Sequence, residues 1–279
     1  MISRRKLAAA LFVAVFLFSG ARAVTPNDPY VWLEDVHGAK PLEWVAEQNE
    51  KSLRVLKADP RYEENYSSIL SVLDASDRIP FGSLYHGWVY NFWQDAANPK
   101  GVWRRTSADD YRKADPHWEV LLDVDALAKA EKENWVFAGA SCAPRQTRCL
   151  IRLSRGGGDA VVIREYDLKA KKLAADGFHL REAKSDAVYL DDDTVLFATD
   201  FGPGSLTQSG YARIVKEWKR GTPLAAAKKL YEGKVEDVAA SPAAFHTRQG
   251  NYGIVARAVS FFETDYFAVE DDGAKKLPL

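Results

Sequence analysis

Short runs of alternating apolar and polar residues fill the sequence from about residue 79 to its end, and they recur in sets. Alternation with a period of two residues is typical of β-strands that have one buried face. Successive sets begin roughly 50 residues apart, which is the spacing of blades in a β-propeller. The predicted strands are residues 84–93, 102–106 and 118–124; then 135–138, 149–153 and 160–166; then 187–190, 194–199, 213–218 and 229–231; and finally 252–257, 266–269 and 275–277.

A β-sandwich is the main alternative, because short strands alone do not distinguish the two architectures. The chain contains 8 Trp and 12 Tyr, and such residues favour broad, flat strand surfaces. The recurrence of four sets favours blades over the two packed sheets of a sandwich. The sequence therefore predicts an all-β fold, a partial β-propeller of about four blades.

A short helical segment is predicted before the first strand. Apolar residues recur at helical spacing over residues 42–56 and again over 62–73, and Asp59-Pro60 separates the two helices. Each helix has an apolar stripe, and such a stripe needs a partner surface to cover it.

The first residues of the chain have the layout of a secretory signal peptide. Residues 4–6 are basic, residues 7–18 form an unbroken apolar run, and Ala21 and Ala23 frame a signal-peptidase site. A short membrane anchor is the alternative, but the apolar run is shorter than the roughly 20 residues that span a bilayer. We therefore expect an exported protein, periplasmic or secreted. The predicted organisation is a signal peptide at 1–23, a helical segment at 24–76 and a partial propeller at 77–279.

Export affects the interpretation of the two cysteines, Cys142 and Cys149. In an oxidising compartment, this pair can close a small loop around Pro144 as a disulfide. A loop this short constrains the unfolded chain only modestly, by about 2 kcal/mol. Two free, buried thiols are the alternative.

Charge argues against nucleic acid as a partner. The chain has 38 Lys and Arg against 39 Asp and Glu, a formal net charge of −1. A nucleic-acid-binding domain normally carries a basic patch or stripe, which this balance does not indicate.

No residue stands out as catalytic. A serine nucleophile on a strained turn needs the pattern G-x-S-x-G, and the sequence has only near misses. Ser141 has Gly139 before it but Ala143 where the pattern requires the second glycine. Ser205 has Pro203 where the pattern requires the first glycine. The histidines have no metal-ligand spacing such as H-E-x-x-H, and each is expected to be a strand or loop residue. They are His37, His86, His117, His179 and His246.

Two further patterns resemble ligand sites but are better explained as turns. Gly156 to Gly158 precedes a strand, whereas a phosphate cradle precedes a helix. Asp191 to Asp193 lacks the alternating spacing of a calcium loop. No cofactor and no metal are therefore predicted.

Several ordered motifs between about residues 28 and 245 resemble the N-terminal half of the prolyl oligopeptidase family of serine peptidases. Each motif is moderately specific, and the ordered set is much more so. The motifs are DPYVWLED at 28–35, WVAEQN at 44–49, NFWQD at 91–95, GVWRRT at 101–106, LSRGGGDA at 153–160, REYD at 164–167, LTQSGY at 206–211 and WKRGTPL at 218–224.

The resemblance implies a fold and an activity. In this family a seven-bladed propeller caps an α/β-hydrolase domain that carries Ser, Asp and His, and the leading helices pack against the hydrolase domain. No residue of this sequence matches a triad position, and the α/β-hydrolase domain is expected to be absent from this chain. The resemblance thus implies the propeller portion of a peptidase that hydrolyses short peptides, often after proline, and that is inactive alone.

The expected partners are peptides or the missing hydrolase domain. No nucleic acid is expected, and no membrane once the signal has been cleaved. A stand-alone propeller module that binds peptides or a protein partner is the alternative function.

Overall fold

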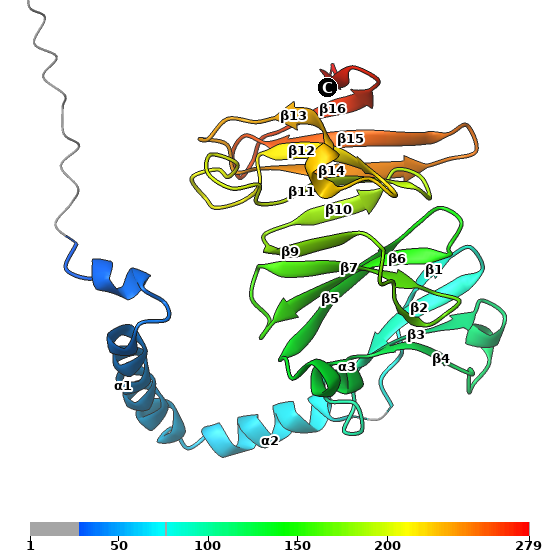
Figure 1. The fold of residues 1–279 in the computed structure, drawn as a ribbon. Helices are drawn as coiled ribbons and strands as arrows, with labels where there is room; N and C mark the ends of the chain where they lie inside the picture. The colour runs from blue at the N-terminus through cyan, green and yellow to red at the C-terminus, as the bar shows by residue number, and fades with distance from the viewer. Residues whose placement is uncertain (1–27, 76, 279) are drawn as a thin grey trace, which may run out of the picture. The chain divides into compact units, whose positions relative to one another are not determined.

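The computed structural model describes residues 28–75 and 77–278, which form two compact units (Figure 1). The first unit ends at Leu73 and the second begins at Asp74. The predicted signal peptide, with Ala21 and Ala23, lies outside the described residues. Among the residues that are described, no helix is long and apolar enough to cross a membrane.

The first unit consists of helices. A short 3₁₀ helix, η1 (Val31–Glu34), precedes α1 (Ala39–Lys57) and α2 (Tyr62–Leu73), which correspond to the two predicted helices. Pro41 is the one buried residue of α1, and α2 has none. The apolar stripes of both helices therefore remain uncovered within this unit.

The second unit consists of four antiparallel sheets, which we call blades 1 to 4 (Figure 1). Within each blade, strands that are consecutive in sequence are hydrogen-bonded neighbours, and in blade 2 an additional strand, β9, pairs with β7. Blade 1 contains β1 (Ser83–Tyr85), β2 (Trp88–Trp93), β3 (Val102–Ser107) and β4 (Glu119–Asp123). Blade 2 contains β5 (Trp135–Cys142), β6 (Arg148–Arg155), β7 (Val161–Asp167), β8 (Lys172–Leu173) and β9 (His179–Ala183). Blade 3 contains β10 (Asp186–Tyr189), β11 (Thr194–Ala198), β12 (Ile214–Lys219) and β13 (Lys228–Glu232). Blade 4 contains β14 (Ala239–His246), β15 (Asn251–Ala258), β16 (Thr264–Glu270) and β17 (Gly273–Lys276).

The prediction of one strand over residues 84–93 is wrong, because the structure has a hairpin there. His86 (φ 48°) and Gly87 (φ 79°) turn the chain between β1 and β2. Positive φ at both central residues is typical of the type I′ turn, whose twist matches that of the flanking strands.

Two larger elements were not predicted from the sequence. Helix α3 (Val124–Glu131) follows β4 directly, and the Asp123 side chain accepts a hydrogen bond from the backbone N–H of Ala126 at its start. Strand β14 is rich in alanine and contains Pro242, which argues against a central strand. β14 pairs on one side only, with β15, so a residue without a backbone N–H is tolerated there.

The core consists of three apolar clusters, one between each pair of consecutive blades. Trp103 and Tyr166 lie in the cluster between blades 1 and 2, Phe197 and Trp218 in that between blades 2 and 3, and Val255 in that between blades 3 and 4. A row of sheets with a core at each junction is propeller packing rather than a two-sheet sandwich. The predicted all-β partial propeller with a short helical segment before it is therefore confirmed.

Candidate functional site

The first strands of all four blades contribute to one cavity of about 420 Å³. These strands are β1, β5, β10 and β14, and each is the edge strand of its blade. Residues from β2 and β3, and Gln146 from the turn after β5, complete the lining. The lining residues are Ser83, Tyr85, Tyr90, Asn91, Phe92, Trp103, Phe137, Ala140, Ser141, Cys142, Gln146, Val188, Tyr189, Ala244 and His246.

One wall of this cavity is a row of stacked aromatic rings. Tyr90 stacks on Trp103 with ring centroids 5.8 Å apart, and Phe92 stacks on Phe137 at 4.8 Å. Trp103 and Phe137 are themselves stacked at 6.1 Å, which joins the two pairs into one row. The pairing register explains the placement, because Phe92 lies opposite Trp103 in adjacent strands and so on the same face of blade 1.

The polar groups around these rings mostly satisfy one another. The Tyr90 hydroxyl donates to Oε1 of Gln146 at 3.2 Å, and Nε2 of Gln146 donates to the carbonyl of Ala143 at 2.8 Å. Among the described residues, no Asp, Glu, Lys or Arg lines the cavity, and His246 is the one lining residue of basic type. Nδ1 of His246 lies 3.1 Å from Oδ1 of Asn251. The cavity is therefore aromatic and close to neutral.

A second cavity, of about 400 Å³, involves the opposite ends of β10 and β14, together with one residue of β5. It is lined by Ala138 of β5, Asp186 of β10 and Ser241 of β14, among others. Charged side chains surround it, including Arg152, whose NH1 lies 3.4 Å from Oδ1 of Asp186. Burial raises the pKa of Asp186, and Arg152 opposes that shift. The two ends of β10 and β14 thus lie at cavities of different chemistry, aromatic at one end and charged at the other.

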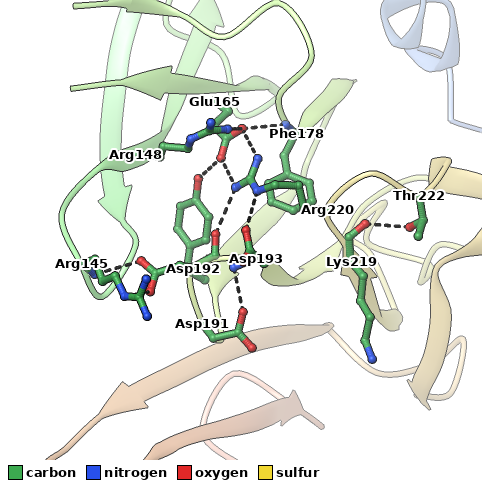
Figure 2. Close-up of polar contacts among 11 residues, drawn as sticks. Arg145, Arg148, Glu165, Phe178, Asp191, Asp192, Asp193, Lys219, Arg220 and Thr222 are labelled. Atoms are coloured by element: carbon green, nitrogen blue, oxygen red, sulfur yellow. Dashed lines mark hydrogen bonds and ion pairs between the residues drawn. The ribbon is translucent and has the colours of Figure 1, made fainter. Parts of the chain in front are cut away.

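A buried ion-pair cluster joins blades 2 and 3 (Figure 2). Glu165 of β7 has no exposed side-chain surface, and its Oε1 lies 2.6 Å from NH2 of Arg220, the residue after β12. Its Oε2 accepts from NH1 of Arg220 at 2.9 Å, which makes the pair bidentate. The hydroxyl of Tyr189 in β10 donates to Oε1 at 2.5 Å, and Arg148 of β6 lies 3.4 Å from Oε2.

These contacts determine the charge state of Glu165. Burial alone would raise its pKa, but the hydrogen bonds from Arg220 and Tyr189 and the charge of Arg148 hold the pKa below the ordinary glutamate value. The hydrogen bond from Arg220 likewise keeps the guanidinium charged, and its pKa is raised. Burial, with the nearby Glu165 charge, raises the pKa of Tyr189. The cluster is thus a stable carboxylate–guanidinium pair, which cross-links blades rather than exchanging protons at neutral pH.

The acidic turn at residues 191–193 participates in this network (Figure 2). Oδ1 of Asp193 lies 2.9 Å from Nε of Arg220, and Oδ2 of Asp192 lies 3.2 Å from Nε of Arg145. Within residues 28–75 and 77–278, no group of three or more His, Cys, Asp or Glu side chains could hold a metal ion.

The remaining candidate residues are distributed over several elements. The structure has a disulfide between Cys142 and Cys149, which are opposite each other in β5 and β6. Ser141 lies in β5 at the aromatic cavity, whereas Ser205 is buried and its Oγ donates to the carbonyl of Gly202 at 2.6 Å. Among the hydrogen bonds of the described residues, none joins a serine hydroxyl to a histidine ring.

Sequence reasoning missed Glu165, Tyr189 and Arg220 as a group. The one local signal is Glu165 itself, a charged residue on the buried face of an apolar strand. Its partner Arg220 is 55 residues away, and no periodicity connects the two.

Comparisons with known proteins agree with this architecture. The family model described as "Prolyl oligopeptidase, N-terminal beta-propeller domain" matches residues 20–268. An uncharacterized peptidase of Sinorhizobium fredii is 39% identical over 243 residues, which are 86% of this chain and 34% of the relative. An uncharacterized peptidase of Rickettsia prowazekii is 33% identical over 237 residues, 79% of this chain and 33% of the relative. The chain thus spans about a third of the length of these relatives.

Solved structures show the same similarity. A post-proline cleaving enzyme from Rickettsia typhi matches with a TM-score of 0.79 and 30% identity, over 89% of this chain and 38% of that one. Oligopeptidase B from Leishmania major matches with a TM-score of 0.65 over 90% of this chain and 35% of that one, and its 14% identity shows the fold alone. Four blades in sequence order, the family motifs and the match to residues 20–268 together show that this chain belongs to the prolyl oligopeptidase family, as part of its N-terminal β-propeller domain.

Proposed function

We propose that this chain is the propeller portion of an exported serine endopeptidase that hydrolyses short peptides, often after proline. The observation that carries the proposal is the family match over residues 20–268, joined to the 30% identity with a post-proline cleaving enzyme. The propeller contributes an aromatic and a charged cavity along its first strands, and both can contact a peptide. The catalytic serine, its base and the oxyanion hole would come from a hydrolase domain.

We further propose that the chain has no peptidase activity by itself. Acyl transfer needs a nucleophile with a base in hydrogen-bond reach, and the described residues offer no serine–histidine pair. The exposed apolar side chains of α1 and α2, among them Leu53 and Ile69, would be covered by the hydrolase domain.

A chimera tests the proposed function. Residues 28–279 would replace the matching segment of the Rickettsia typhi enzyme, and hydrolysis of a Gly-Pro fluorogenic peptide would be measured. We expect the chimera to cleave this peptide and the isolated chain to leave it intact. A folded chimera without activity would contradict the peptidase role, and cleavage by the isolated chain would contradict its inactivity.

Export is supported by the basic, apolar and small-residue layout of the first residues, and by the Cys142–Cys149 disulfide, which suits an oxidising compartment. The mature protein would begin at Val24. N-terminal sequencing of protein recovered from the periplasm or the medium tests this, and an intact Met1 would contradict it.

A stand-alone binding module is the second candidate function. The aromatic cavity favours it, since four strands form a ligand-sized space without any hydrolase domain. Peptide binding by a monomeric chain, with an inactive chimera, would support this candidate over the first.

A further inference from the structure

The lining of the aromatic cavity favours one kind of peptide side chain over others. Its volume of about 420 Å³ lies within the range of about 300–1,000 Å³ that is usual for ligand pockets. It is too small for a folded partner and large enough for one or two side chains. An occupant must therefore insert a small part of itself into the space that the first strands of the four blades enclose.

The stacked row of rings favours an aromatic insert. Tyr90, Trp103, Phe137 and Phe92 already stack with neighbouring centroids 4.8–6.1 Å apart, and offset stacking is one of the two preferred arrangements of aromatic pairs. Tyr85, at the same cavity, is 36% exposed, so the lining remains open to a further ring. A ligand ring would extend an arrangement that the protein has already formed.

The lack of charge in the lining limits what can enter. Because no Asp, Glu, Lys or Arg of the described residues lines the cavity, a charged side chain that entered it would lose its hydration without gaining a charged partner in the lining. The polar groups of Tyr90 and Gln146 are already engaged with each other. The insert is therefore uncharged.

The strand edges beside the cavity favour a peptide over a small molecule. Among the described strands, β5 pairs only with β6, and β10 only with β11, so the other edge of each presents unpaired backbone groups. Ala140 to Cys142 of β5 and Val188 and Tyr189 of β10 lie at the cavity. An extended segment can pair its backbone with such an edge while it places a side chain in the adjacent pocket.

We propose that this cavity binds the side chain of an aromatic residue in an uncharged, extended peptide segment. The proposal rests on the proposed function, in which peptides are the substrates. It adds a second requirement on the peptide, besides the residue at the cleaved bond. The peptide must also carry an aromatic residue, which the rings of blades 1 and 2 contact. Peptides that carry such a residue would be retained in preference to those that do not.

Calorimetric titration of the purified chain with three probe peptides tests the proposal. Each probe is an acetylated pentapeptide amide of glycine, with phenylalanine, alanine or glutamate at its centre. We expect the phenylalanine peptide to bind at least about tenfold more tightly than the other two, from ring burial and stacking. Equal affinities for the three peptides would overturn the proposal.

Two variants locate the binding. Phe137→Leu keeps an apolar side chain in the core but removes the ring, and we expect it to abolish the preference for phenylalanine. Phe262→Leu removes a ring that is 95% exposed and lies outside the cavity, and it should leave the preference unchanged. An equal loss in both variants, or no loss in Phe137→Leu, would overturn the assignment to this cavity.

The outcomes separate this proposal from the peptidase role. If no probe binds and the chimera still cleaves its substrate, the cavity proposal fails and the proposed function stands. If the phenylalanine peptide binds and the chimera is inactive, the cavity proposal stands and the proposed function fails. N-acetylphenylalanine amide serves as the small-molecule control, and binding as tight as that of the pentapeptide would overturn the role of the strand edges.

Discussion

At the scale of single residues, Glu165 is the clearest case of a side chain whose role depends on its surroundings. It has no exposed surface, and it contacts Arg220, Tyr189 and Arg148 from three other strands or strand ends. A carboxylate buried without these partners would be strongly unfavourable. The cluster therefore fixes how blades 2 and 3 pack, in addition to the apolar contacts between them.

Glu165→Gln should destabilise the second unit by about 3 kcal/mol, because the half-buried Arg220 would lose its main counter-charge. Urea unfolding measures the change. Arg112→Ala is the matched control, because it removes an ion pair with Asp109 in which the side chains are 79% and 95% exposed. The Arg112→Ala variant should lose less than about 1 kcal/mol of unfolding free energy. Equal losses in the two variants would show that burial of the pair is unimportant.

The pKa of Glu165 predicts a pH dependence. Its pKa in the folded protein is below the ordinary value of 4.5, so its contribution to stability is fully present above pH 4.5. The contribution is lost as the pH falls through the folded pKa, where Glu165 takes up a proton. The difference in unfolding free energy between the native chain and Glu165→Gln should therefore be constant near neutral pH and shrink below pH 4.5. A difference that does not change down to pH 2 would contradict this assignment.

At the scale of elements, the β5–β6 hairpin connects a disulfide to the candidate site. Cys142 and Cys149 are paired across the two strands, and Gln146 in the turn (φ 55°) accepts the hydrogen bond from Tyr90. The disulfide thus closes the turn that holds one side of the aromatic cavity. Sequence spacing indicated the bond, but it did not indicate that Tyr90 of blade 1 contacts the same turn.

Reducing this disulfide should lower the unfolding free energy by about 2 kcal/mol, since the closed loop is short and restricts the unfolded chain only modestly. Urea unfolding with and without a reductant measures the loss. The double variant Cys142→Ser and Cys149→Ser should have the stability of the reduced chain and should not respond to reductant. A response of that variant would mean that the reductant acts elsewhere.

At the scale of the whole second unit, the face of blade 4 turned away from blade 3 carries exposed aromatic residues. Phe245 pairs with Tyr252 across β14 and β15, and Tyr266 pairs with Ala256 across β15 and β16, so all four lie on one face. Phe245 is 59% and Tyr252 50% exposed. Contiguous exposed apolar surface of this kind is typical of an interface.

We expect the purified chain to self-associate as its concentration rises, and sedimentation velocity measures this. Replacing Phe245 and Tyr252 together by Thr, which keeps β-propensity, should shift the chain towards monomer. Val136→Thr, at an isolated exposed position of blade 2, is the control and should have no effect. A native chain that remains monomeric at all concentrations would contradict the prediction.

Much of the architecture was predictable because blades are local structures. Period-two runs and turn residues lie within some 50 residues of each other, and antiparallel neighbours in a blade are consecutive in sequence. The exceptions have physical reasons. The hairpin at His86-Gly87 was not predicted because it requires a positive φ at a histidine. Strand β14 was not predicted because it contains Pro242 and several alanines, which are uncommon in strands.

The sequence by itself determined the number of blades, the helical segment before them, and the family, because these depend on residue types at short spacings. Only the tertiary structure decided which residues meet between blades. It brought the first strands of four blades to one aromatic cavity, and it paired Glu165 with Arg220 across 55 residues. Contacts between blades depend on how the folded sheets pack against one another. Neither the periodicity of a strand nor the spacing of residues within one blade specifies these contacts.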